Sequence, residues 1–325
     1  MKSASSFVVV GIILLTVVSA TDTSFQKLDK EGHEVNHSPF AKRFMPLVDT
    51  IEPFSSSIAD DAEKFATIDG FDRAINAYME QNLFSLCVLI ALYLPAVFLG
   101  RKLMEDRPAF DLKVPLILWN AGLALFSVWG TLYMVPVYYR YFVDLSWYTS
   151  VCTRWCYGYG AENYLLLVFT LSKIAEFVDT AFIVLRKKPL LFLHYYHHVT
   201  TVSYCVYSVT IAHHYGCYGH MFTAMNFFVH SFMYTYYALS ACGFRLPEFV
   251  ATIITVLQIA QMIAGIAITV TLTQCPRTSW ETVYSGGLLY GSFFVLFAEF
   301  FLKRYVLKVR GRSQRKEGPE EKKRM

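Results

Sequence analysis

The chain has 325 residues, of which 55% are hydrophobic, 17% aromatic and only 17% charged, and its formal net charge is +4. Soluble domains carry about 25% charged residues, so this composition excludes an ordinary soluble enzyme and indicates a membrane protein. The net charge is modest, and we expect no nucleic-acid partner.

Residues 1–20 have the pattern of a secretory signal peptide. Lys2 gives a positive start, residues 7–18 form an apolar core, and residues 18–20 resemble a small-residue cleavage site. The alternative is an uncleaved anchor, but the apolar run is shorter than the ~20 residues that a membrane span needs. Cleavage would direct the following segment to the lumen of the endoplasmic reticulum (ER).

Residues 21–82 form a polar, predominantly acidic segment that we expect in the lumen. Asn36 lies in a formal glycosylation motif, which Pro39 follows at once. Apolar residues at helical spacing over residues 65–79 predict an amphipathic helix that leads to the membrane. Residues 21–60 are equally compatible with a disordered tail.

Seven apolar stretches follow, each close to the ~20 residues needed to cross the hydrocarbon core. We therefore predict an all-α membrane protein with a seven-helix domain over residues 83–305. The stretches lie near residues 83–100, 114–136, 163–185, 190–212, 217–241, 249–273 and 283–304.

Lys and Arg residues set the predicted orientation, because cytosolic loops are enriched in them. If the first span runs from lumen to cytosol, the short lumenal loops hold only Arg140, Arg154 and Arg277. The N-terminus is then lumenal and the C-terminus cytosolic. The cytosolic side receives Arg101, Lys102, Arg107, Lys113, Arg186, Lys187, Lys188 and Arg245, together with ten Lys and Arg residues between positions 303 and 324.

Residues 306–325 form a basic tail that ends in Lys322-Lys323-Arg324-Met325. Lysines at the third- and fourth-last positions of a cytosolic tail form a dilysine ER-retrieval signal, an address that a receptor reads. The alternative is simply a solvated charged tail. Because the signal requires a cytosolic C-terminus on a membrane protein, and the loop charges independently predict one, we expect a multi-pass protein of the ER membrane.

The seven cysteines have no spacing typical of a zinc site, and we predict no metal. Cys152, Cys156 and Cys275 fall in predicted lumenal loops, where the compartment is oxidising. A bridge from Cys275 to Cys152 or Cys156 would join the second–third loop to the sixth–seventh loop. Cys152–Cys275 is the pair that we predict.

The third and fourth spans carry clusters of ionisable groups, which are costly inside a bilayer unless they are paired. Lys173 and Glu176 in the third span are three residues apart and can pair, with Asp179 close by. A self-neutralising cluster that joins helices would explain them, without excluding catalysis. The fourth span opens with a histidine box, His194, His197 and His198, whose spacing puts all three on one helix face.

Three imidazoles on one face can bind a metal, exchange protons or act as nucleophiles. A single membrane histidine is often only an interhelical hydrogen-bond partner. At 1.5 Å per residue, the polar groups of four spans fall in one layer, between the cytosolic half and the midplane. A basic rim at Arg186, Lys187 and Lys188 suits an anionic cytosolic ligand such as a phosphate-bearing carrier. The other polar members of the layer are Asn226, His230, Gln258 and Gln261.

Four ordered motifs in these spans resemble those of the ELO family of very-long-chain fatty acid elongases, and the resemblance covers residues 65–310. The motifs are Lys-x-x-Glu-Phe-x-Asp-Thr at residues 173–180, the histidine box at residues 194–198, Asn226 and His230 with Met233, Tyr234, Tyr236 and Tyr237, and Thr255 with Gln258 and Gln261. Pro189 stands where relatives acting on polyunsaturated chains usually carry Gln. We therefore place the chain in the subgroup for saturated and monounsaturated chains.

The resemblance implies a 3-ketoacyl-CoA synthase that condenses a long-chain acyl-CoA with malonyl-CoA, releasing CoA and CO2, without a cofactor. It implies seven helices, six of them around a narrow acyl tunnel that is open to the cytosol and closed at the lumenal end. The ketoacyl reductase, dehydratase and enoyl reductase of the elongation cycle would be partners, and the chain could form a homodimer.

Residue roles follow from the same resemblance and from the chemistry of acyl-imidazoles. His197 would carry the acyl group, and His230 would position it or transfer a proton. His194 and His198, with the Asn and Gln side chains, would stabilise negative charge. The supporting residues are Lys173, Glu176, Asp179, Asn226, Tyr234, Gln258 and Gln261.

Two rival functions remain open. A membrane di-iron desaturase or hydroxylase also uses a His-x-x-His-His box, but such sites need about eight histidines in three boxes. His213, His214 and His220 fall at a predicted lumenal turn, on the wrong side, where solvation accounts for them. A seven-helix receptor fits the topology, but leaves the histidine box and the buried charges unexplained.

Overall fold

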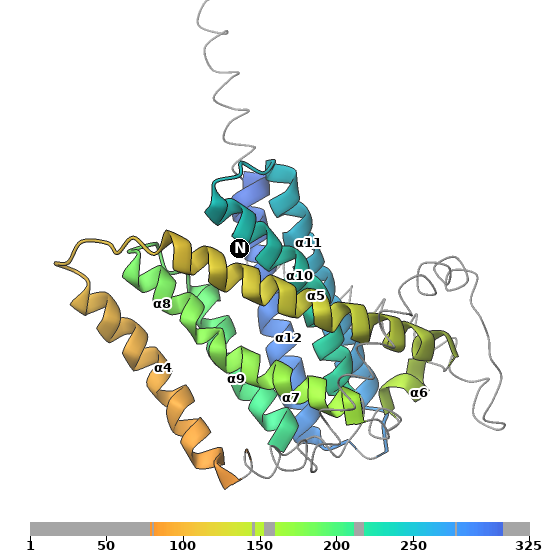
Figure 1. The fold of residues 1–325 in the computed structure, drawn as a ribbon. Helices are drawn as coiled ribbons and strands as arrows, with labels where there is room; N and C mark the ends of the chain where they lie inside the picture. The colour runs from red at the N-terminus through yellow and green to blue at the C-terminus, as the bar shows by residue number, and fades with distance from the viewer. Residues whose placement is uncertain are drawn as a thin grey trace, which may run out of the picture.

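All regular elements that the computed structural model describes are helices (Figure 1). The predicted signal peptide, the glycosylation motif at Asn36, the amphipathic helix of residues 65–79 apart from its last residue, and the dilysine pair lie outside the described residues. The described residues are 79, 81–144, 147–152, 160–210, 218–276 and 278–307.

Each predicted span corresponds to helical structure, although the third consists of two helices. It breaks at Glu176, where the N–H of Asp179 bonds the Glu176 carbonyl three residues back, at 3.0 Å. The helices are α4 (Leu83–Leu103), α5 (Lys113–Asp144), α6 (Trp147–Cys152), α7 (Gly160–Ala175), α8 (Phe177–Leu185), α9 (Phe192–Thr210), α10 (Tyr218–Cys242), α11 (Glu248–Leu272), α12 (Trp280–Phe301) and the π-helix η2 (Leu302–Leu307).

Among the described helices, α4, α5, α11 and α12 are long and apolar enough to cross a membrane. The remaining spans fall short for two reasons. Helices α7 and α8 are short because their span is interrupted, and α9 and α10 carry histidine, tyrosine and other polar side chains that lower their hydropathy. The chain is thus a multi-pass membrane protein, and the polar helices are those that hold the residues singled out from the sequence.

The helices pack in a closed cycle. Helix α7 contacts α9, α9 contacts α12, α12 contacts α11, α11 contacts α10, and α10 contacts α7 again. Helix α5 packs along α10, while α4 lies outside the cycle against α8 and α9, at the left of Figure 1. This arrangement encloses the inward faces of α7, α9, α10, α11 and α12.

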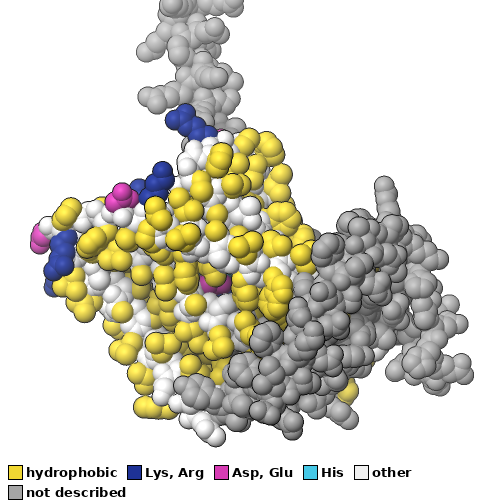
Figure 2. Space-filling model, viewed as in Figure 1, with side chains coloured by type: hydrophobic (Ala, Val, Ile, Leu, Met, Phe, Trp, Pro, Cys, Tyr) yellow, Lys and Arg dark blue, Asp and Glu magenta, His cyan; other side chains and the backbone are white. Residues whose placement is uncertain are grey.

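The outer surface is hydrophobic over most of the face shown in Figure 2, with Lys and Arg side chains gathered along its upper edge. Large apolar side chains point outward from several helices: Phe84 is 81% exposed, Leu125 72% and Leu288 74%. Such a surface is stable only against lipid or another protein. By contrast His220, expected at a solvated turn, is fully buried, because α10 already begins at Tyr218.

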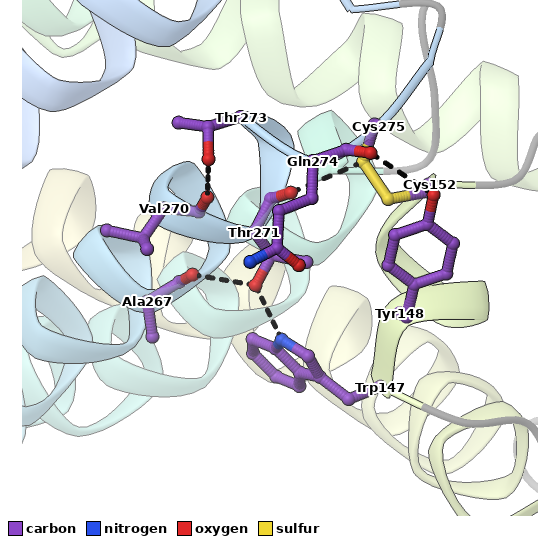
Figure 3. Close-up of a disulfide and its surroundings, with 9 residues drawn as sticks. All are labelled: Trp147, Tyr148, Cys152, Ala267, Val270, Thr271, Thr273, Gln274 and Cys275. Atoms are coloured by element: carbon purple, nitrogen blue, oxygen red, sulfur yellow. Dashed lines mark hydrogen bonds between the residues drawn. A yellow bond between two sulfur atoms is a disulfide. The ribbon is translucent and has the colours of Figure 1, made fainter. Parts of the chain in front are cut away.

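A disulfide joins Cys152 at the end of α6 to Cys275 just after α11, across 123 residues of sequence (Figure 3). This is the predicted pair, whereas the alternative partner Cys156 lies outside the described residues. Beside it, the indole N–H of Trp147 donates to Thr271 Oγ1 at 2.6 Å. The disulfide and this hydrogen bond fix α6 against the end of α11.

Candidate active site

The helical cycle encloses a hollow of about 330 Å³, which we call the polar cavity. Its volume lies within the range of about 300–1,000 Å³ that is usual for small-molecule sites. Polar groups reach it from Glu176 between α7 and α8 and from α8, α9, α10, α11 and η2. The predicted site residues in its wall are Glu176, Asp179, His194, His197, His198, Asn226, His230, Tyr234, Gln258 and Gln261.

Lys173 and Glu176 form a buried ion pair beside this cavity. Lys173 Nζ lies 2.6 Å from Glu176 Oε1, and the two residues are 3% and 4% exposed. The ammonium group also lies 4.4 Å from the centre of the Phe169 ring, where the negative face of the ring attracts a cation. Because neither charge reaches water, each depends on the other, and removing one would leave an uncompensated buried charge.

His230 contacts this ion pair through one ring nitrogen and Asn226 through the other. Lys173 Nζ lies 3.4 Å from His230 Nδ1, and Asn226 Nδ2 lies 3.2 Å from His230 Nε2. An ammonium group can only donate, so Nδ1 accepts and Nε2 carries the ring proton. The Asn226 amide then accepts that proton when it turns its oxygen toward the ring. The contacts with Lys173 and Asn226 thus orient the His230 ring.

Asp179 is held by donors from two other helices. The indole N–H of Trp119 in α5 donates to Asp179 Oδ1 at 2.5 Å, and the hydroxyl of Tyr234 in α10 donates to Oδ2 at 2.9 Å. Both carboxylate oxygens are therefore hydrogen-bonded in the wall of the polar cavity. Trp119 was not identified from the sequence.

His194 is tied to the outer helix α4 by a short chain of hydroxyl groups. Thr180 Oγ1 lies 2.9 Å from His194 Nε2, and the Tyr93 hydroxyl lies 2.7 Å from the same Thr180 oxygen. The chain passes from α4 through α8 to α9. The rings of His194 and His198 lie close together, with 4.4 Å between their centres.

His197 lines the polar cavity and packs against aromatic rings of α12. Its Nδ1 is buried and has no hydrogen-bond partner among the described residues. Its ring lies against Phe293 of α12, with 4.7 Å between ring centres. A buried polar atom without a protein partner is costly and calls for an explanation.

A second hollow of about 50 Å³, the narrow cavity, continues from His197 along α9. It shares His197, Asn226, Gln261 and Met262 with the polar cavity, and its wall extends along α9 to Ser208. Eleven residues separate His197 from Ser208, or about 16 Å of helix. His197 therefore lies at the junction of two hollows that differ in character.

Aromatic rings constrict the narrow cavity. The Tyr290 ring packs directly over Gly265, where an added Cβ would lie 2.3 Å from a ring carbon. Phe222 lies on the other side, with 4.6 Å between the two ring centres. Only glycine at position 265 lets the Tyr290 ring lie so close to α11.

The basic rim predicted at Arg186, Lys187 and Lys188 does not line the polar cavity. Lys187 Nζ instead donates to the carbonyl oxygens of Glu105 and Arg107, at 3.0 and 3.1 Å. The cation in the cavity wall is Arg304 of η2, together with Tyr305. Arg304 was not identified from the sequence, because it is one of many basic residues near the C-terminus.

Within the described residues, no group of three or more His, Cys, Asp or Glu side chains is arranged to hold a metal ion. The three histidines of the box have different partners. His194 bonds a threonine, His197 packs against Phe293, and His198 lies between the other two rings. The described geometry therefore gives no specific support to the di-iron alternative.

The sequence is similar to a known family and to several characterised proteins. Residues 78–313 match the family described as ELO: GNS1/SUR4 family. The chain is 40% identical over 227 residues to very long chain fatty acid elongase 6 of Drosophila melanogaster, covering 66% of this chain and 70% of the fly protein. It is 37% identical over 245 residues to the human elongase 6, covering 72% and 89%. It is also 35% identical over 274 residues to long chain fatty acid elongase 1 of Caenorhabditis elegans, covering 82% and 89%.

Proposed function

The chain belongs to the ELO: GNS1/SUR4 family, and from this membership we propose that it is a very-long-chain 3-ketoacyl-CoA synthase. The reaction would join a long-chain acyl-CoA to malonyl-CoA, giving a 3-ketoacyl-CoA two carbons longer, free CoA and CO2. One observation carries the residue assignment: at the junction of the two cavities, Nδ1 of His197 has no hydrogen-bond partner among the residues that the structure describes.

In the first step, a ring nitrogen of His197 attacks the thioester carbonyl of the acyl-CoA. The carbon–sulfur bond breaks, CoA leaves as the thiol with the imidazole proton, and the acyl group remains as an N-acyl imidazole. Neutral imidazole is a good acyl acceptor, and its acyl derivative is an activated carbonyl. Within the described residues, Nδ1 of His197 has no hydrogen-bond partner, whereas His230 has contacts on both ring nitrogens, and this contrast supports His197 as the acceptor.

In the second step, malonyl-CoA loses CO2, and the electron pair of the broken carbon–carbon bond attacks the acyl carbonyl. The carbon–nitrogen bond then breaks and His197 is regenerated when it takes up a proton. Negative charge develops on the carbonyl oxygens of both substrates during this step. Donors fixed before the reaction stabilise such charge at little reorganisation cost. His194, His198, Asn226, Gln258 and Gln261 line the polar cavity and would serve as these donors.

The Lys173–Glu176 pair and Asp179 would act through other residues. Lys173 holds Nδ1 of His230, and Glu176 lies 3.8 Å from the same nitrogen. His230 would position the carbanion or return a proton to the site. The Lys173–Glu176 pair is buried and Asp179 is held by Trp119 and Tyr234, so these groups would position His230 and the cavity wall.

We assign the polar cavity to the thioester end of the carrier and the narrow cavity to the acyl tail. Arg304 would contact the phosphates of CoA, since arginine binds phosphate through paired N–H donors. At about 50 Å³ the narrow cavity is too small for a long acyl chain. Its aromatic rings must therefore move when the chain enters, and together the cavities would form the acyl tunnel.

The topology and location of the enzyme also belong to this proposal. Seven spans, with a lumenal N-terminus and a cytosolic C-terminus, agree with the distribution of Lys and Arg in the sequence. The polar cavity would then open to the cytosol, where CoA esters are found. The dilysine pair would retain the enzyme in the ER, where a ketoacyl reductase, a dehydratase and an enoyl reductase would complete the elongation cycle.

A two-stage assay with the purified full-length protein tests the proposal. With acyl-CoA alone, we expect about one equivalent of CoA to be released and the acyl group to appear on a peptide that contains His197. Addition of malonyl-CoA should then release the 3-ketoacyl-CoA. Elongation without any acyl-enzyme would contradict the acyl-imidazole step, and absence of elongation with all chain lengths would contradict the proposed function itself. Iron bound in stoichiometric amount would favour the di-iron alternative.

A further inference from the structure

A third hollow lies outside the helical cycle, between the end of α4 and the link from α8 to α9. It has a volume of about 480 Å³, and we call it the basic hollow. It shares no residue with the polar cavity or the narrow cavity, so it is separate from the proposed reaction site. Its wall consists of Phe98, Arg101, Lys102, Met104, Glu105, Val184, Lys187, Lys188 and Leu190.

The charges around the basic hollow are unbalanced. Four cationic side chains face one carboxylate, that of Glu105. Within the described part of the chain, no ion pair is found for Arg101, Lys102 or Lys188. In Figure 2, Lys and Arg side chains lie over the end of α4 that Figure 1 places at the left. A concave group of like charges raises the local potential and attracts an anion.

Lys187 holds two segments of the wall of the basic hollow together. Its backbone has φ of 53°, in the left-handed region that residues other than glycine seldom adopt. Its ammonium group is held by the carbonyl oxygens of Glu105 and Arg107. These bonds attach the α8–α9 link to the segment after α4, so both sides of the hollow are fixed relative to each other.

The rest of the wall is apolar and continues onto the outer surface of α4. Val184 is buried at the base of the hollow, and Phe98 is 48% exposed at its edge. Helix α4 is a candidate membrane span, and Leu92, Leu99 and Leu103 on it are 58–59% exposed. A ligand that bears an anionic group on apolar chains would match both parts of this surface.

We propose that the basic hollow binds the phosphate-bearing headgroup of an anionic membrane phospholipid, with its acyl chains along α4. The position beside a lipid-facing helix favours a lipid over a soluble phosphate compound. Cations near a bilayer surface attract acidic lipids, each contributing about fivefold in affinity. This site is additional to the proposed reaction and does not depend on it.

Binding to the purified full-length protein tests this site directly. The apparent dissociation constant of phosphatidylserine would be measured by native mass spectrometry, with phosphatidylcholine as the neutral lipid. The test variant is Lys102→Gln/Lys188→Gln, which removes two cations but leaves Lys187 and its backbone bonds intact. The control is Arg245→Gln/Lys303→Gln, which removes two exposed cations that do not line the hollow.

We expect the wild type and the control to prefer phosphatidylserine, and the test variant to bind it about 30-fold more weakly. Equal weakening in both double variants, or equal affinity of the wild type for the two lipids, would overturn the proposal. Displacement of phosphatidylserine by CoA would instead assign the hollow to the phosphates of the carrier. All of these measurements report lipid binding and not the rate of elongation. Their failure can therefore be told apart from failure of the proposed enzyme activity.

Discussion

The two cavities that meet at His197 differ in size and in the groups that line them. The polar cavity, of about 330 Å³, holds ionisable side chains, and one of them, Asp179, is bonded to two other helices. The narrow cavity, of about 50 Å³, combines packed rings such as Phe222 and Tyr290 with the hydroxyl groups of Thr201, Tyr204 and Ser208. In the first, prearranged charges and dipoles can stabilise a reacting group, while in the second the small volume restricts which ligand fits.

The difference also explains why one histidine stands apart. His230 and His194 have contacts that fix their rings, whereas Nδ1 of His197 has none within the described residues. Bonded rings at His194 and His230 beside a His197 nitrogen without a partner in the described part of the chain suit a nucleophile and its support. The following variants test the roles of the polar cavity and the narrow cavity, in order of decreasing expected effect.

Replacing His197 by Ala should have the largest effect. Loss of the acyl acceptor should reduce elongation at least about 1,000-fold, because removal of a nucleophile leaves only the contribution of binding and positioning. The rate would be measured with labelled malonyl-CoA and normalised to folded protein. His220→Gln, which changes a fully buried histidine that lines neither cavity, should keep most of its turnover per folded molecule. Acylation of the His197→Ala protein in the absence of malonyl-CoA would rule out the assignment.

Replacing Asp179 by Asn keeps the shape of the side chain but removes its charge. The amide nitrogen cannot accept from Trp119 or Tyr234, so the wall of the polar cavity should loosen and kcat should fall about 10–100-fold. Trp119→Phe removes one of the two bonds and should give a smaller loss of the same kind. Asp111→Asn, at an exposed carboxylate, serves as the control. Equal kcat in wild type and Asp179→Asn would show that this network is only structural.

Replacing Arg304 by Gln tests the mouth of the polar cavity. Loss of a charge-assisted contact to phosphate should raise the KM for acyl-CoA and malonyl-CoA about tenfold, with little change in kcat. Lys303→Gln is the matched control, because this neighbour is exposed and pairs with Glu299 rather than lining the cavity. A similar rise in both variants would mean that general surface charge, and not Arg304, attracts the carrier.

Replacing Tyr290 by Leu tests the narrow cavity and should change selectivity more than rate. The smaller side chain relieves the constriction over Gly265, so longer acyl-CoAs should gain about fourfold for each methylene accommodated. Gly265→Ala should act in the opposite direction, because its new Cβ pushes the Tyr290 ring into the cavity. Tyr284→Leu, at an outward-facing position of α12, is the control. Product lengths would be read by mass spectrometry, and identical profiles in all four proteins would exclude Tyr290 as a determinant of chain length.

Most of the residues of the polar cavity were predictable from the sequence. Ionisable groups within apolar stretches are rare, so Lys173, Glu176 and the histidine box were conspicuous against their surroundings. Helical spacing then placed the histidines on one face, and the rise per residue put several spans in one layer. The pairing of Lys173 with Glu176 at 2.6 Å follows from their separation by three residues.

Only the tertiary structure shows which distant residues complete the hydrogen-bond network around Asp179 and His194. It also shows where the nearby Lys and Arg side chains point. Trp119 and Tyr93 are ordinary aromatic residues of apolar spans, and only the packing of α5 and α4 against α8 brings them to Asp179 and Thr180. Periodicity within one helix contains no information about the neighbour that it will meet.

For the same reason, the sequence placed the basic rim of Arg186, Lys187 and Lys188 at the polar cavity, which these residues do not line. The sequence by itself determined a multi-pass helical membrane protein with a buried layer of histidines and charges, because apolar length and intramembrane polarity are local properties. Only the tertiary structure turned Lys187 and Lys188 toward α4, brought Arg304 to the polar cavity and joined that cavity to a narrow one at His197. These contacts depend on how the helices pack around one another. The spacing of residues along one helix does not determine that packing.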